Sequence, residues 1–273
     1  MTVEEIRVSS QWLDLREAAD AAARARDLVA HVRRRLPATG RWVIHDLAGG
    51  TGAMGRWLAP LLPGPQHWVV HDRDAELLAI AADDLPGPPA DGAPVVVETR
   101  RTDITRVDPD DLADASLITA SALLDLMTGD ELARLAGVCA APGCPVLLTL
   151  SVAGRVDLGP ADPLDFRVAA AFDAHQRRMT SAGRLLGPDA AAAAVSEFGR
   201  LGAEVLVRPS PWRLGASEAD LAAEWLAGWV GAAGEQEVEL AAELEPYVER
   251  RLIQARTGQL HVTVGHTDLL VLP

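Results

Sequence analysis

The stretch VIHDLAGGTG, residues 43–52, decides the fold of this chain. Apolar residues lead into an acid, Asp46, and then into a turn that contains Gly49, Gly50 and Gly52. A short apolar run that ends in glycine is typical of a buried parallel strand. Glycine suits such a turn because the backbone can approach a ligand where no Cβ stands in the way. The helix predicted to follow would offer free N–H groups and a positive potential to a carboxylate or phosphate.

Strand and helix patterns alternate outward from this turn. Five apolar strand patterns, separated by helical segments, are expected at 42–47, 68–71, 95–100, 117–120 and 145–150. A sixth helix–strand pair follows at 190–200 and 204–207, and the last patterns, 260–264 and 269–272, can belong to one bulged strand. This alternation predicts an α/β, Rossmann-like, doubly wound sheet of seven mostly parallel strands.

We expect a single domain over residues 1–273, opened by a helix over 10–36. The segments 152–188 and 210–258 interrupt the alternation. Both should leave the carboxyl ends of strands, where open α/β sheets bind ligands, so we interpret them as helical lid insertions.

Composition and charge exclude several kinds of function. The formal net charge is −14, which disfavours a nucleic-acid partner. All 25 basic residues are arginine, which excludes Schiff-base chemistry and the P-loop lysine. The seven histidines are scattered, so no metal site is expected. The N-terminus has no apolar signal core and no apolar run is long enough to cross a bilayer, so the sequence predicts a cytoplasmic protein with free, buried Cys139 and Cys144.

Two kinds of cofactor fit the glycine turn. Gly50, Gly52 and Gly55 form a literal G-x-G-x-x-G, and Asp72 lies 20 residues after Gly52. This spacing is the dinucleotide-binding fingerprint, so an NAD(P)-dependent oxidoreductase stays open as an alternative.

Three features favour a different cofactor. Asp46 lies inside the turn motif, where it would repel a pyrophosphate and could accept from an amino group. Asp103 follows the third strand, where an acid can meet an adenine amino group. Tyr247 is followed four positions later by Arg251, so the Tyr-x-x-x-Lys pair of short-chain dehydrogenases is absent.

These motifs together resemble the class I S-adenosylmethionine-dependent methyltransferase family of small-molecule type. Residues 46–52 resemble its motif I, with Ala48 where the family commonly has its first glycine. Asp72 resembles the ribose acid, Asp103 with Ile104 resembles the adenine clamp, and residues 121–125 resemble the motif that faces the methyl group and the substrate. The resemblance covers residues 40–150 well and the rest only in topology. It implies S-adenosyl-L-methionine as cofactor, bound by Asp46, Ala48, Gly49, Gly50, Gly52, Asp72, Arg73, Asp103, Ile104, Ser121 and Arg16.

The acceptor side is less specified. Related enzymes often cover the cofactor with an N-terminal helix, the role expected of 10–36, and Arg16 on it could reach the methionine carboxylate. A hydroxyl or acidic C–H acceptor needs a base, for which His175 is the first candidate, although a lone histidine on a lid helix is more often a surface or packing residue. Candidate substrate-binding residues are Trp12, Asp125, Arg178 and Trp212.

The expected activity is therefore methyl transfer to a small-molecule acceptor, without a nucleic-acid or membrane partner. The sequence leaves open whether the acceptor atom is O, N or C, and it leaves the oligomeric state open. A non-catalytic relative of the fold, which binds a ligand or partner through the insertions, is a further alternative.

Overall fold

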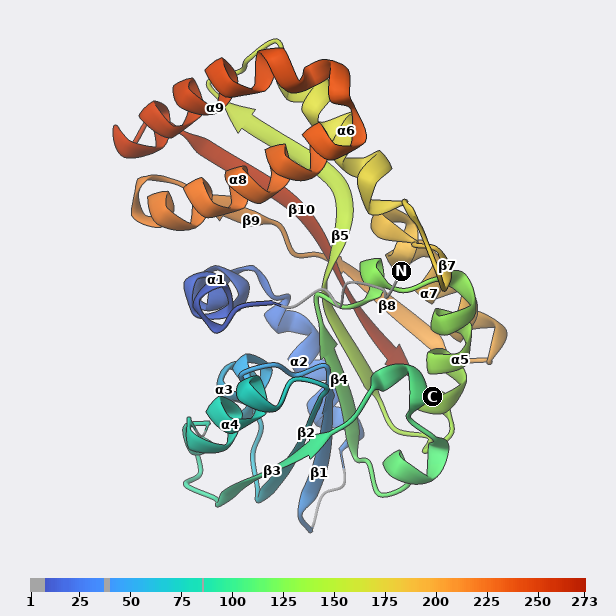
Figure 1. Cartoon of the computed structure of the whole chain (residues 1–273). Helices are drawn as coiled ribbons and strands as arrows, with labels where there is room; N and C mark the ends of the chain where they lie inside the picture. Colours follow the sequence, from blue (N-terminus) through green and yellow to red (C-terminus); the bar gives the residue numbers. More distant parts are fainter. Residues whose placement is uncertain (1–7, 37–39, 85) are drawn as a thin grey trace.

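The computed structural model describes residues 8–36, 40–84 and 86–273. One sheet in the order β3-β2-β1-β4-β5-β10-β8 forms its centre, and β9 pairs with β10 off this path (Figure 1). Neighbouring strands from β3 to β5 are parallel, whereas β10 runs antiparallel to both β5 and β8. The strands are β1 Trp42–Leu47, β2 Gln66–Asp72, β3 Val95–Arg101, β4 Leu117–Ser121, β5 Val146–Gly159, β8 Glu204–Pro209, β9 Trp212–Leu214 and β10 His261–Leu272. The predicted Rossmann-like α/β fold is confirmed.

Helices cover both faces of this sheet because its central strands are apolar on both sides. One face packs against α2 and α3 around Trp68, Ile44 and Leu58. The other face packs against α5 and α7 around Leu135, Phe198 and Leu148. The helices are α1 Ser10–Ala23, α2 Arg26–Arg35, α3 Ala53–Leu58, α4 Ala75–Asp83, α5 Gly129–Ala140, α6 Asp165–Gln176, α7 Ala190–Arg200, α8 Ala219–Gln236 and α9 Ala241–Arg256. None of the described helices is long and apolar enough to cross a membrane.

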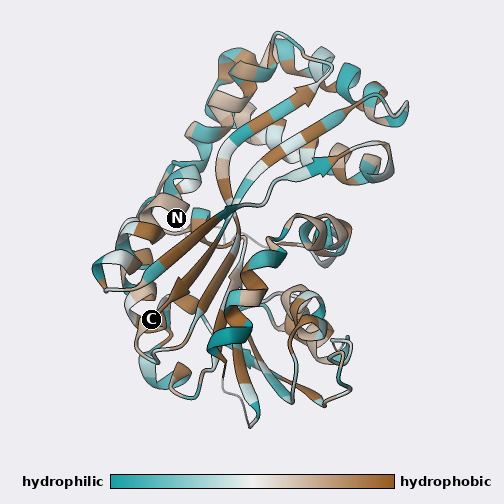
Figure 2. Ribbon diagram, turned by 180° about the vertical axis from the view of Figure 1, so that it is seen from behind, coloured by the Kyte–Doolittle hydropathy of each residue, from teal (hydrophilic) through white to brown (hydrophobic). Residues whose placement is uncertain are grey.

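The long strands β5 and β10 carry the chain beyond the central sheet. Residues 146–151 of β5 are all buried, whereas 152–159 alternate between half-buried and exposed. Figure 2 shows the same change, from uniformly hydrophobic strands to alternating ones. The outer halves of β5 and β10 pair with each other, and that of β10 also pairs with β9. They support α6, α8 and α9, which pack around Trp229, Leu226 and Tyr247. The expected insertion at 152–188 therefore begins as a strand, because Val152, Val156 and Leu158 follow the two-residue period of a half-buried sheet. It continues through α6 and a short hairpin, β6 Met179–Thr180 and β7 Gly183–Arg184.

The expected single helix over 10–36 is instead two helices, α1 and α2, separated at Arg24 and Ala25. A buried carboxylate from β10 holds this break. Asp268 accepts hydrogen bonds from Ala25 N at 2.8 Å and from Leu150 N at 2.8 Å. The bulged last strand is confirmed, since β10 is continuous with register shifts after Val264 and after Thr267. Both cysteines are free and buried, as predicted.

Candidate cofactor and acceptor site

The glycine turn after β1 has the backbone that its sequence requires. Gly50 has a φ of 54° and Ala48 a φ of 51°, both in the left-handed region. Glycine adopts that region freely, whereas alanine at the same φ costs about 1–2 kcal/mol. At Gly49 a Cβ would lie 2.6 Å from Asp46 Oδ2 and 2.7 Å from a methyl group of Val70. The turn is therefore built for close approach of the backbone to the Asp46 carboxylate.

Backbone strain gathers at this edge of the sheet. Among the described residues, three other than glycine have a positive φ: Ala48, Ala122 and Leu150. Ala48 follows β1, Ala122 follows β4, and Leu150 lies in the neighbouring β5, where Thr149 O accepts a hydrogen bond from Ala122 N at 2.9 Å. Strained backbone of this kind clusters at active sites and ligand clamps. The carboxyl edge of β1, β4 and β5 is thus the candidate functional site.

Asp46 is a buried carboxylate, and one of its two oxygens has no hydrogen-bond partner among the described residues. Its Oδ1 accepts a hydrogen bond from Thr119 Oγ1 at 2.7 Å, and its Oδ2 has no hydrogen-bond partner among the described residues. Burial raises the pKa of Asp46 to about 7, against the opposing effects of Thr119 and Arg24. An unpaired buried acceptor is costly, so Oδ2 is suited to receive a donor from a ligand.

Arg24 faces the same region from the end of α1, and sequence reasoning missed it. Its side chain is buried, and its Nη2 donates to Ser121 Oγ at 3.2 Å. Its Nε and Nη1 have no hydrogen-bond partner within the described part of the chain. Burial lowers the pKa of the Arg24 guanidinium, while the charges of Asp20 and Asp46 oppose that shift. Arg24 follows Arg16 and Asp20 at intervals of four, so helical spacing could have placed all three on one face.

Asp72 binds the glycine turn from the end of β2. Its Oδ2 accepts from Gly50 N at 2.9 Å, and its Oδ1 accepts from Asp74 N at 2.9 Å. Its charge also raises the pKa of Asp46 as a minor cause, so the two carboxylates share one neighbourhood. An acid that already aligns the turn can accept ribose hydroxyls with its remaining lone pairs.

The residues expected at the adenine lie one strand further out. Asp103 follows β3, two residues beyond Arg101, which neighbours Asp72 in register, and its side chain is 46% exposed. It accepts from Thr105 N at 3.0 Å and from Thr105 Oγ1 at 2.7 Å, and it feels the charge of Arg73. Ile104 is half-buried against the main core. The structure therefore keeps Asp103 and Arg73 next to the Asp72 end of the site.

Arg16 lies on the inner face of α1, paired within its own helix. Asp20 accepts from Arg16 Nε at 2.9 Å and from Arg16 Nη2 at 3.2 Å. Asp20 also accepts from Trp212 Nε1 at 2.9 Å. The Arg16 guanidinium carbon lies 5.0 Å from the Trp212 ring centre and 5.9 Å from that of Trp12. The Arg16 guanidinium is thus bound to Asp20, whereas Nε and Nη1 of Arg24 have no hydrogen-bond partner among the described residues.

The residues expected on the acceptor side divide into two groups. Asp125 is buried in the turn after β4, its Oδ1 has no partner among the described residues, and burial raises its pKa while Arg16 and Arg178 lower it. Arg178 donates to His175 O at 3.2 Å. His175 lies at the end of α6, where its Nε2 is 3.2 Å from Glu235 of α8. Asp125 therefore lies with Arg16, whereas the His175 side chain is turned toward α8.

Helix α1 covers the glycine turn. Figure 1 shows it between α3 and β9, in the angle between the central sheet and the outer halves of β5 and β10. A Cβ added to Gly50 would lie 3.2 Å from Leu13 Cδ1. Glu17 accepts from Arg56 Nε at 2.8 Å, which ties α1 to α3. A ligand that reaches the turn would lie beneath this helix.

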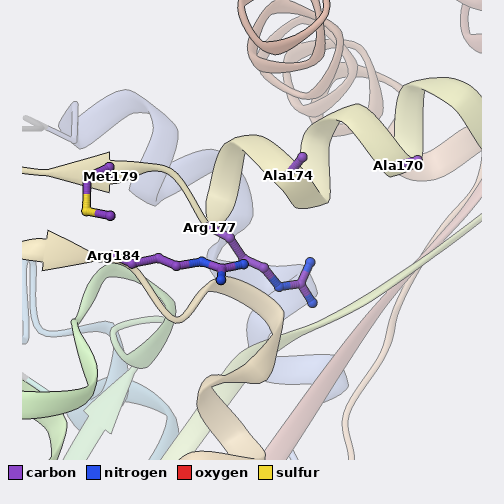
Figure 3. Close-up of a pocket in the computed structure, with 5 residues that line it drawn as sticks. All are labelled: Ala170, Ala174, Arg177, Met179 and Arg184. Atoms are coloured by element: carbon purple, nitrogen blue, oxygen red, sulfur yellow. The ribbon is translucent and has the colours of Figure 1, made fainter.

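An open groove lies elsewhere on the molecule. It has a volume of about 580 Å³ and is lined by residues of α6 and of the β6–β7 hairpin (Figure 3). Arg177 and Arg184 extend across it, but the Arg177 fork is occupied by Asp189, at 2.6 Å from Nε. None of the residues expected to bind a cofactor lines this groove, so it is separate from the candidate site.

No protein-family model matches this sequence, and no curated protein matches it. A cyclopropane-fatty-acyl-phospholipid synthase-like protein from Lactobacillus casei has a similar structure, with a TM-score of 0.53, 16% identity, and coverage of 97% of this chain and 94% of that chain. A SAM-dependent methyltransferase from Geobacter sulfurreducens, in complex with S-adenosyl-L-homocysteine, is 16% identical over 97% of this chain and 98% of that chain, with a TM-score of 0.45. A cyclopropane synthase from Mycobacterium tuberculosis is 14% identical over 90% and 83%, with a TM-score of 0.47. The first of these likenesses shows that this chain shares the fold of that protein.

Proposed function

We propose that this chain is a class I S-adenosylmethionine-dependent methyltransferase that acts on a small molecule. The observation that carries the proposal is a pair of unsatisfied opposite charges. Arg24 offers two buried N–H donors, and Asp46 offers one buried oxygen, on the same edge of the sheet. An α-amino acid carries a carboxylate and an ammonium group, which would satisfy both residues at once.

The remaining contacts extend this fit toward a nucleoside. Asp72 lies next to Asp46, where its carboxylate can hold a ribose. Gly49 and Gly50 leave the backbone open to close approach. Asp103, Ile104 and Arg73 lie beyond Asp72 and are proposed to hold the adenine. Amino acid, ribose and base are the parts of S-adenosylmethionine, in the order in which the residues follow the sheet edge.

The topology argues against the nicotinamide alternative. Dinucleotide-binding Rossmann folds have the strand order 3-2-1-4-5-6. In this chain an antiparallel strand, β10, lies between β5 and β8. Asp46, whose Oδ2 would approach any ligand bound over Gly49, also disfavours a pyrophosphate.

The chain's own residues would mainly bind and position. When bound, the cofactor supplies a methyl group activated by a sulfonium centre, with a neutral thioether as leaving group. Arg24 and Asp46 would fix the amino-acid end, Asp72 the ribose, and α1 would exclude water from above. Holding two reactants in line in this way can lower the activation barrier by about 7–11 kcal/mol.

Calorimetric titration with S-adenosylhomocysteine tests the proposal, with NADH as the comparison ligand. We expect saturable binding of S-adenosylhomocysteine at micromolar concentration and no heat with NADH. Binding of NADH alone, or of neither ligand at millimolar concentration, would reject the proposal.

A further inference from the structure

Two buried histidines from neighbouring strands form a hydrogen-bonded pair. His45 of β1 is 0% exposed and His71 of β2 is 1% exposed. Their ring centres are 5.2 Å apart, and His45 Nδ1 lies 2.9 Å from His71 Nε2. The other nitrogen of each ring also has a partner: His45 Nε2 lies 2.9 Å from Asp114 Oδ1, and His71 Nδ1 lies 3.3 Å from Thr102 Oγ1. Thr102, His71, His45 and Asp114 therefore form one connected set, here called the histidine network.

The direction of each hydrogen bond in the histidine network follows from chemistry. Burial raises the pKa of the Asp114 carboxyl, but its hydrogen bond with His45 outweighs that effect and the pKa is lowered, so Asp114 is an ionised acceptor. Burial lowers the pKa of His45 against the effect of Asp114, and burial with the charge of His45 lowers the pKa of His71 to about 4. Both rings are therefore neutral at pH 7. His45 Nε2 then donates to Asp114, His71 Nε2 donates to His45 Nδ1, and His71 Nδ1 accepts from the Thr102 hydroxyl.

The histidine network joins the two ends of one loop. Residues 102–116 connect β3 to β4, and this loop carries Asp103 and Ile104, which are proposed to hold the adenine. Thr102 is the first residue of the loop and immediately precedes Asp103, whereas Asp114 lies near its other end. Through the two histidines, both ends of the loop are thus bound to the buried strands β1 and β2.

His71 also connects the loop to the rest of the proposed cofactor site. Its backbone oxygen accepts a hydrogen bond from Gly49 N at 2.9 Å, in the glycine turn. The next residue, Asp72, accepts from Gly50 N at 2.9 Å and is proposed to hold the ribose. The His71 side chain accepts from Thr102, beside Asp103. One residue of β2 therefore relates the glycine turn, the ribose acid and the start of the adenine loop.

Packing alone does not require polar side chains at these two positions. Apolar side chains of similar volume would avoid the cost of burying polar atoms. The middle of the loop is already held by Val107 and Leu112, which are buried in the main core, and by Arg134, which donates to Val107 O at 2.7 Å. A fully satisfied polar network adds direction, because it specifies one arrangement of the groups that it joins. The histidine network therefore contributes the placement of the loop ends.

We propose that the histidine network positions the loop that carries Asp103, and that it thereby sets the preference of the cofactor site for adenine over hypoxanthine. This inference rests on the proposed methyltransferase function and names the residues that determine specificity for the base. The members of the network are positioning residues, and Asp103 is the group that would contact the base.

The chemistry of Asp103 explains why its position controls the choice of base. Both contacts with Thr105 use Asp103 Oδ1, whereas Oδ2 lies 3.6 Å from Arg106 Nε, beyond hydrogen-bond distance. A carboxylate oxygen accepts a hydrogen bond from the 6-amino group of adenine, but it faces an oxygen in hypoxanthine. A displaced Asp103 would lose this contact with adenine and would gain nothing with hypoxanthine, so the preference between the two bases should fall.

The test compares the affinities for S-adenosylhomocysteine and S-inosylhomocysteine, which contains hypoxanthine in place of adenine, by calorimetry at pH 7.5. We expect the native protein to bind S-adenosylhomocysteine at least about tenfold more tightly, as for one hydrogen bond to a charged group. Thr102→Val keeps the shape of the side chain but removes the hydroxyl that donates to His71, and the preference should fall to about threefold or less. Thr102→Ser keeps the hydroxyl and should keep the native preference. The matched control is His67→Gln, in the same strand as His71, because His67 contacts Glu98 and is not part of the histidine network.

A double variant separates positioning from stability. His45→Leu with His71→Leu removes the polar network without leaving one histidine unpaired, so the chain should fold with unchanged or higher stability in urea and yet lose the preference for adenine. If this variant and Thr102→Val do not fold, Asp114→Ala gives the same comparison at a side chain that is 63% exposed.

Two results would overturn the inference. The first is a native protein that binds both ligands equally. The second is a native preference that persists in the folded variants of the network, including the case in which both ligands weaken by the same factor. Failure of S-adenosylhomocysteine itself to bind the native protein would instead reject the proposed function.

Discussion

Arg24 and Asp46 lie close enough for their charges to interact, yet they share no hydrogen bond among the described contacts. Burial of two unpaired ions is costly, and proteins normally pair such groups with each other. A ligand that carries both complementary charges would satisfy the donors of Arg24 and the oxygen of Asp46 that the protein leaves without a partner among the described residues. The proposed binding of the methionine end of the cofactor follows from this relationship.

The pKa of Asp46 predicts a pH dependence of ligand binding. Burial raises the pKa of Asp46 to about 7, opposed by Thr119 and Arg24 and aided by Asp72. Only the ionised carboxylate pairs with the ligand ammonium, so affinity should fall as the pH drops below 7. We expect the Kd for S-adenosylhomocysteine to be about tenfold higher at pH 6 than at pH 8.

Calorimetry in two buffers of different ionisation enthalpy checks this dependence, because binding near pH 6.5 should release a proton. Asp46→Asn should bind more weakly at every pH and lose the dependence. A flat native profile between pH 6 and 8 would count against an ion pair at Asp46.

Asp72 is predicted to contribute to binding of the ribose and not of the amino acid. Asp72→Asn keeps the size of the side chain but removes its charge. We expect it to weaken both S-adenosylhomocysteine and 5′-methylthioadenosine at least tenfold, since both contain the ribose. The control is Asp74→Ala, which removes the cap of α4 and should lower stability by about 1 kcal/mol without weakening either ligand. Equal affinities for Asp72→Asn and native protein would place the ribose elsewhere.

Ala48 predicts a stability gain from its backbone conformation. Its φ of 51° is strained for alanine. Ala48→Gly should raise the free energy of unfolding by about 0.5–1 kcal/mol, because the strain relieved exceeds the extra backbone entropy that glycine loses on folding. In a chain of this size, each kcal/mol raises Tm by about 2–4 °C. Ala48→Val should lower Tm. The control is Ala133→Gly in the interior of α5, which should lower the free energy of unfolding by about 1 kcal/mol. A loss of stability in Ala48→Gly would contradict the account.

Local patterns predicted the central sheet because each strand is short, apolar and bounded by turn residues. The first strand was predicted at 42–47, with the bounds that β1 has. Two features depend on contacts distant in sequence. Asp268 breaks the N-terminal helix from 243 residues away, and β5 continues beyond Leu150 because β10 pairs with it. A local sequence pattern does not indicate contacts between residues so distant in sequence.

The candidate site divides in the same way. Asp46, Asp72 and the glycine turn follow from motif spacing within one strand–turn–helix unit. Arg24 was missed because its significance lies in side-chain donors that have no partner among the described residues of the folded chain. The spacing of Arg16, Asp20 and Arg24 was visible, but helical spacing alone does not tell a buried face from a solvated one.

Differential binding of two ligands tests the central claim most directly. S-adenosylhomocysteine and 5′-methylthioadenosine share the nucleoside, and only the first carries an amino-acid group. For Arg24→Gln the account predicts a loss of about 10–100-fold in affinity for S-adenosylhomocysteine, because a charged hydrogen bond is lost, and no change in affinity for 5′-methylthioadenosine. In the control Arg26→Gln, where the arginine is exposed, neither affinity should change. Equal losses for both ligands, or no loss for S-adenosylhomocysteine, would contradict it.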